Sequence, residues 1–253
     1  MTEPCVYEIE ARSPLSRIRS ARPLSGAVRQ LQMINVHKSV YRFFWRFFGR
    51  FFWPFFWRCL FLSARRRTVH GIKVGVLLPM VSAEEELFSK VAAALDLLRD
   101  HGPRQLARMR RLVSGVLVFG SVGSDGEWHR EVRLILLREP NLAKSDTHPA
   151  NVACLLVHEI SHAWLEHRGC EYVSGRRRRI EAICCRAEAR LARRIPGGNE
   201  LGGYYEVRAQ QILSQSGDDW SDAAFRKRAD GNLHILGAPT WLMRFIERFR
   251  PGI

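Results

Sequence analysis

The sequence predicts an α+β fold in which helices prevail toward the C-terminus. Short runs rich in β-branched and other apolar residues are typical of strands, and they lie at 72–78, 112–119 and 131–137. Longer segments carry apolar residues at helical spacing, and they lie at about 83–100, 149–166, 177–194, 203–215, 219–228 and 239–249. This order of elements, rather than a regular strand–helix alternation, indicates the α+β class.

The strand runs lie in the first half of the predicted domain. The segment between 112–119 and 131–137 contains Asp125 and Gly126, a dipeptide that often forms hairpin turns. We therefore expect these two strands to be joined as a hairpin. The helix at 83–100 opens with three consecutive glutamates, which suit the positive end of a helix dipole.

The helix at 149–166 has clear start signals. Thr147 or Asp146 can cap it, and Pro149 falls in the first turn, where its missing N–H costs nothing. The segment is mostly apolar, so we expect the helix to be buried on several faces.

A metal-binding pattern lies within this helix. His158 and His162 are four residues apart and therefore share one helix face, with Glu159 directly after the first histidine. Both imidazoles can reach one metal ion, and zinc favours nitrogen and thiolate ligands. In the alternative interpretation the two histidines are core residues bonded to the backbone, and Glu159 lies on a solvated face.

A catalytic zinc site needs a third protein ligand. The extended form of the pattern needs glycine at position 165 and histidine at position 168, where this chain has Leu165 and Arg168. The remaining candidates are carboxylates on the helix at 177–194. Glu181 and Glu188 are seven residues apart and lie on nearly the same face, so both stay open.

The run His158-Glu159-Ile160-Ser161-His162, followed by a helix with Glu181-Ala182, resembles the zincin metallopeptidases of the gluzincin type, and the small single-domain members most of all. The resemblance covers roughly residues 110–195. It implies a zincin-like core with a small mixed sheet, an active-site helix and a following glutamate-bearing helix. It further implies Zn²⁺ held by His158, His162 and Glu181, with Glu188 as the rival ligand.

The same resemblance implies a zinc metallopeptidase that hydrolyses peptide bonds in a protein or peptide substrate. Glu159 would be the general base toward a zinc-activated water. Three residues are candidates for stabilising the oxyanion: Tyr204, Tyr205 and His234. In zincins an edge strand commonly pairs with the substrate backbone, and the run 132–137 is either that strand or an ordinary internal one.

An aromatic repeat precedes the predicted domain, which we place at 69–253 after an arm at 1–68. Residues 42–57 repeat in steps of four, with Arg42, Arg46 and Arg50 in equivalent positions. On a helix these arginines form a cationic stripe opposite an aromatic face, because each step turns the position by only about 40°. This pattern favours an interfacial helix at 42–62 on a membrane surface. A spanning helix is disfavoured by the arginines and by Pro54.

Charge is concentrated in this arm. Residues 1–70 hold 13 Lys and Arg against 3 Asp and Glu, in a chain whose formal net charge is +15. Such an excess favours anionic membrane surfaces or nucleic acid. The chain has no recognisable nucleic-acid-binding module, so nucleic acid is the less favoured partner. An alternative function is a non-catalytic zincin-like interaction protein that attaches to a membrane or nucleic acid through the arm.

The cysteines and the N-terminal segment bear on location. The six cysteines show no Cys-x-x-Cys spacing, so a zinc finger is not indicated. Cys154, Cys184 and Cys185 fall on apolar helix faces and are expected to be small buried thiols. Reduced thiols and a polar stretch at 1–40 without a secretory signal favour a cytoplasmic protein, peripheral at the inner face of a membrane.

Overall fold

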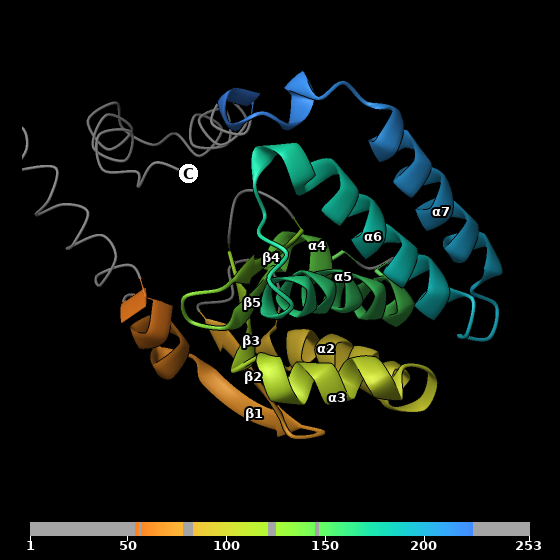
Figure 1. Cartoon of the computed structure of the whole chain (residues 1–253). Coiled ribbons are helices and arrows are strands. Elements are labelled where there is room, and N and C mark those ends of the chain that lie inside the picture. The colour runs from red at the N-terminus through yellow and green to blue at the C-terminus, as the bar shows by residue number, and fades with distance from the viewer. Residues whose placement is uncertain (1–53, 56, 78–82, 121–124, 145–146, 225–253) are drawn as a thin grey trace, which may run out of the picture. The chain divides into compact units, whose positions relative to one another are not determined.

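The computed structural model describes residues 54–55, 57–77, 83–120, 125–144 and 147–224. The fold is α+β, and the described residues form one mixed sheet of five strands in the order β1-β2-β3-β5-β4 (Figure 1). The strands are β1 Arg65–Val69, β2 Ile72–Leu77, β3 Gly115–Phe119, β4 Gly126–His129 and β5 Leu134–Arg138. β2, β3 and β5 run parallel, while β1 and β4 are antiparallel edge strands.

The predicted hairpin of 112–119 and 131–137 is wrong. β3 and β5 are parallel neighbours, so a tight turn cannot join them. The chain passes instead to the sheet edge, returns as β4 and then turns into β5. Gly126 begins β4 rather than closing a hairpin turn. The run 132–137 contributes to the internal strand β5, and the edge strand is β4.

Helices pack in successive layers on one side of the sheet (Figure 1), and these are α2 Glu84–His101, α3 Pro103–Leu112, α5 Pro149–His167, α6 Ser174–Ala192 and α7 Asn199–Ser214. α2 and α5 confirm two predicted helices, and α6 and α7 confirm two more. α6 packs on α5, and α7 packs on α6. Within the described ranges, α3 and the short α4 Glu139–Leu142 are helices that were not predicted.

The predicted C-terminal helices are described only in part. A 3₁₀ turn at Asp218–Trp220 and helical residues 222–224 fall in the predicted helix at 219–228. The rest of that segment and the predicted helix at 239–249 lie outside the described residues.

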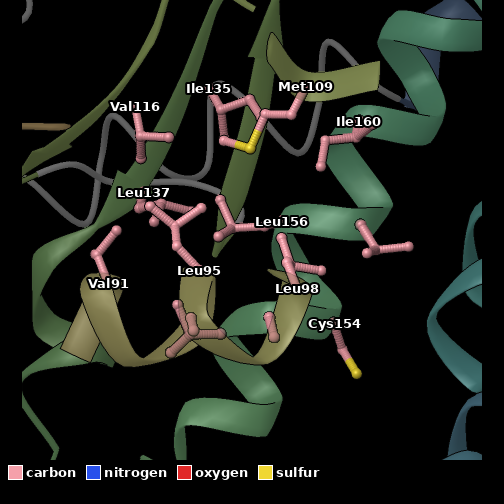
Figure 2. Close-up of a cluster of buried hydrophobic side chains, with 14 of the residues drawn as sticks. Val91, Leu95, Leu98, Met109, Val116, Ile135, Leu137, Cys154, Leu156 and Ile160 are labelled. Carbon is pink, nitrogen blue, oxygen red and sulfur yellow. The ribbon is translucent and has the colours of Figure 1, made fainter. Parts of the chain in front are cut away.

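The main core lies between the sheet and the helices, and strand alternation directs side chains into it. Figure 2 shows Val116 of β3 and Ile135 and Leu137 of β5 together with Leu95 of α2 and Leu156 of α5. All five of these residues are fully buried, with 0% of their surface exposed. The core therefore fixes α5, the helix that carries the histidine motif, against the sheet through its apolar face.

The other face of the sheet is covered by the end of the aromatic segment. Residues 57–63 are helical, and Trp57 and Phe61 pack with Leu117, Leu134 and Leu136. A Cβ placed on Gly115 would lie 2.4 Å from Cζ of Phe61, so the glycine provides the space that the ring occupies. Part of the predicted arm, including β1, is therefore integral to the sheet.

The membrane prediction for 42–62 lies mostly on residues that are not described. Its described end, from residue 57, is packed on the sheet as above. No helix in the described part of the chain has the length and apolar character needed to cross a bilayer.

Candidate metal centre

The start of α5 is set by a histidine. His148 is the N-cap residue, and its Nδ1 accepts a hydrogen bond from the Ala150 N–H at 3.2 Å. The predicted cap Thr147 is wrong, because its hydroxyl donates to the Asn141 carbonyl at 2.6 Å. The alternative cap, Asp146, lies outside the described residues. Pro149 is the first helical residue, as predicted.

α6 presents a polar face to α5. Glu181, Cys184, Cys185 and Glu188 follow one another at spacings of three, one and three residues, so they lie on one side of the helix. The contacts of these residues are with the histidine face of α5. The approach is close enough for the Cys154 thiol to lie 3.8 Å from the Glu188 carbonyl oxygen.

The two histidines and both candidate glutamates meet at this helix pair. Glu181 lies between the imidazoles, with Oε2 at 3.1 Å from Nε2 of His158 and Oε1 at 3.4 Å from Nε2 of His162. Glu188 contacts the other nitrogen of His158, with Oε2 at 2.9 Å from Nδ1. His158 is thus held between two carboxylates, one on each ring nitrogen.

The surroundings set the protonation of these groups. Burial lowers the pKa of His158, but hydrogen bonds to Cys185, Glu181 and Glu188 outweigh it and raise the pKa well above its ordinary value. Burial lowers the pKa of His162 to about 4, so this imidazole is neutral at physiological pH. Burial raises the pKa of Glu181, but its hydrogen bond to His158 and its electrostatic interactions with the two histidines lower it to about 2. The site therefore offers an ionised carboxylate and a neutral imidazole.

Glu159 lies on a different side of α5, beneath the edge strand. A Cβ on Gly126 of β4 would lie 3.2 Å from its Oε1 and 2.9 Å from Cδ1 of Leu155. The glycine thus lets β4 approach this part of α5 closely. Burial raises the pKa of Glu159 to about 8. The alternative interpretation, in which Glu159 lies on a solvated face, is wrong, because the residue is 4% exposed.

Tyr172 is a site residue that was not predicted. It lies in the loop between α5 and α6, where its hydroxyl donates to Oε1 of Glu181 at 2.5 Å and its ring packs edge-on against His162. Of the predicted oxyanion candidates, Tyr204 is 60% exposed on α7. Tyr205 is buried close to Glu188, and His234 lies outside the described residues. The only sequence signal for Tyr172 is its place between the two ligand-bearing helices.

Cys154, Cys184 and Cys185 are buried thiols, as predicted, and the last two lie at the site. His158, His162 and Cys184 bring potential ligand atoms within 4.8 Å of one another, and so do His158, Cys185 and Glu188. Nitrogen, oxygen and sulfur donors in this combination fit zinc chemistry. Burial raises the pKa of Cys184 well above its ordinary value, which disfavours the thiolate as a ligand.

Comparisons of the chain with protein-family models, curated proteins and solved structures found no match. The zincin resemblance therefore remains a prediction that depends on the motif and on the arrangement of the side chains around it.

Proposed function

We propose that this protein is a zinc metallopeptidase of the zincin type, with the core that the resemblance implies. The observation that carries the proposal is the position of Glu181, which contacts Nε2 of both His158 and His162 through separate oxygens. Two imidazole nitrogens and one carboxylate oxygen are a ligand set of catalytic zinc sites that keep an open position. This arrangement supports His158, His162 and Glu181 as the residues that would hold the metal.

Glu188 has a different role in this proposal. Histidines that bind metals usually donate their second ring N–H to a carboxylate, which fixes the tautomer and orients the ring. The contact between Glu188 and Nδ1 of His158 is of this kind. It leaves Nε2 of the same ring, which faces Glu181, for the metal. Glu181 is therefore the proposed third ligand and Glu188 the residue that positions His158.

The chemistry follows from the groups around the ligands. Zinc bound here would act as a Lewis acid toward the scissile carbonyl and would acidify water. Glu159 would accept a proton from the attacking water and deliver it to the leaving amine. Its raised pKa of about 8 suits proton transfer near neutral pH. The Tyr172 hydroxyl, rather than Tyr204 or Tyr205, is the proposed hydrogen-bond donor to the developing oxyanion, and it would have to give up its hydrogen bond to Glu181 to act in this way.

Zinc affinity of matched variants of the full chain tests the ligand assignment. Glu188→Gln should weaken zinc binding by about 10- to 100-fold, the usual effect of losing a group that orients a ligand. Glu181→Gln should weaken it more, because a direct ligand loses its charge. Competition with a chromophoric chelator measures both affinities, and metal analysis of the native full chain should give about one zinc per chain.

The two substitutions are matched because each replaces a carboxylate in contact with His158 by an amide of the same shape. A larger loss in Glu188→Gln than in Glu181→Gln would exchange the two roles. Folded native chain that takes up no zinc would contradict the proposal. It would favour the alternative of a non-catalytic interaction protein that acts through its N-terminal arm.

The proposal includes a cytoplasmic location with peripheral attachment to the inner face of a membrane. The support is the repeat of arginines and aromatic residues at 42–53. Each arginine near an anionic surface contributes about 1 kcal/mol. Replacing Arg42, Arg46 and Arg50 by Gln should therefore weaken binding of the full chain to vesicles with 30% phosphatidylserine by roughly 100-fold. Cosedimentation measures this, and equal binding to neutral phosphatidylcholine vesicles would contradict it.

A further inference from the structure

A cavity of about 560 Å³ lies beside the C-terminal part of α5, outside the metal centre. Its walls come from three elements: the end of α3, the β4 edge strand with the turn that follows it, and the last two turns of α5. The polar and aromatic residues that determine its character are Arg111, Trp128, Arg130, Arg133, Glu166 and His167. This volume is in the range of ligand-binding pockets.

The cavity carries an excess of positive charge. Glu166 is the single carboxylate among its lining residues, and both of its oxygens are engaged. Oε1 pairs with Nε of Arg130 at 2.9 Å, and Oε2 accepts from Nε1 of Trp128 at 2.8 Å. Arg133 is fixed by donating to the Leu112 and Arg111 carbonyls at 2.6 Å each. Its guanidinium remains a positive charge in the wall.

Among the described residues Arg111, like Arg133, has no carboxylate partner, and its guanidinium is not fixed by backbone carbonyls as that of Arg133 is. Its guanidinium lies 5.3 Å from the centre of the Trp164 ring, which Arg108 and Arg168 also approach, at 4.3 and 5.8 Å. Burial and the charges of Arg104, Arg111 and Arg190 lower the pKa of Arg108, as expected where like charges crowd together. An anion in the cavity would offset this repulsion.

The position of the cavity relates it to the metal centre. Glu166 follows Glu159 by seven residues on α5, which corresponds to roughly 10 Å along the helix. β4 runs in the same direction as α5, since Gly126 lies against Glu159 and Trp128 donates a hydrogen bond to Glu166. In the described sheet β4 has a strand partner on one side only. An extended peptide beside β4 would advance by about 3.3 Å per residue. If one residue of this peptide lay level with Glu159, the side chain about three residues further along the peptide would reach the cavity.

We propose that this cavity is a substrate subsite that binds the carboxylate of an Asp or Glu side chain about three residues from the scissile bond. Arg111 is the main partner of that carboxylate, because guanidinium groups bind carboxylates through two parallel hydrogen bonds. Arg130 and Arg133 supply the positive surroundings. The inference rests on the proposed peptidase function, but binding at the cavity can be measured without hydrolysis.

Binding to the full-length, zinc-loaded Glu159→Gln protein tests the subsite. The probes are fluorescein-labelled alanine-rich decapeptides with a single Glu, Gln or Lys at each position in turn, and fluorescence anisotropy gives their affinities. We expect Glu at one position to bind on the order of tenfold or more tighter than Gln there. Adding Arg111→Ala should remove this difference, and Arg111→Glu should favour the Lys peptide.

Arg66→Ala is the matched control, because it removes the same charge from the exposed β1 strand at the opposite edge of the sheet. It should leave the preference unchanged. Equal or undetectable binding of the Glu and Gln peptides, or a preference that persists in Arg111→Glu, overturns the subsite. Hydrolysis by the native chain without any preference for acidic peptides would support the peptidase proposal and contradict the subsite. Acidic preference without hydrolysis supports the subsite and contradicts the peptidase.

Discussion

Replacing Glu159 by Gln is expected to reduce peptide hydrolysis by roughly 10²- to 10⁴-fold and to leave zinc binding intact. Glutamine keeps the shape of the buried side chain beneath Gly126 but cannot accept the proton of the attacking water. The loss corresponds to roughly 3–5 kcal/mol of activation free energy. It should appear in kcat rather than in metal content, because Glu159 is not among the proposed zinc ligands.

Hydrolysis of a random library of quenched fluorogenic peptides by the full chain measures this effect, with zinc content determined on the same samples. Ser161→Ala is the control within the motif, since the Ser161 hydroxyl donates to the Val157 carbonyl of its own helix at 2.7 Å. This variant should retain hydrolysis. Activity near the native level in Glu159→Gln would remove Glu159 as the general base, even if the zinc site proved correct.

Replacing Phe61 by Ala is expected to destabilise the fold by about 3–5 kcal/mol, the usual cost of removing a buried phenylalanine side chain. Phe61 is 8% exposed, and its ring fills the space above Gly115, which has no side chain of its own to occupy the cavity. The unfolding midpoint should fall by roughly 10 °C in a domain of this size. Thermal unfolding followed by circular dichroism measures the change.

Leu62→Ala provides the comparison, because Leu62 is the next residue and is 61% exposed. Its effect should stay within about 0.5 kcal/mol. Equal stability of the native chain and Phe61→Ala would mean that the aromatic segment does not pack on the sheet. The segment from residue 57 would then belong to the predicted membrane-binding arm.

The parts of the fold that could be predicted were those with strong local periodicity. The long amphipathic segments of α2, α5 and α6 left little ambiguity. α3 was missed in part because its last residue, Leu112, is continuous with the apolar run of the next strand. Leu112 was therefore assigned to the strand predicted at 112–119. β4 was missed because it is short and follows a glycine- and serine-rich loop, in which Asp125-Gly126 indicated a turn. Its position at the sheet edge depends on pairing with β5, which local sequence does not specify.

The candidate site likewise has residues that the sequence could group and residues that only the packing of the chain brings together. The spacing of His158 and His162 fixes their shared face within one helix, so sequence was enough to group them. Glu181 and Glu188 share a helix face too, and only the packing of α6 on α5 determines which nitrogen of His158 each one meets. Tyr172 reaches the site from a loop, whose conformation has no periodic signal.

The packing of Trp57 and Phe61 has a consequence for how the chain folds during synthesis. Their partners Leu134 and Leu136 belong to β5, which leaves the ribosome long after the aromatic segment. Until β5 is made and paired, the two rings lack the part of their sheet surface that Leu134 and Leu136 supply, and exposed aromatic surface promotes aggregation of nascent chains. Closing this contact across a long stretch of chain also slows folding. The early aromatic segment thus completes its burial only once β5 is in place, and chains truncated before β5 would leave it partly exposed.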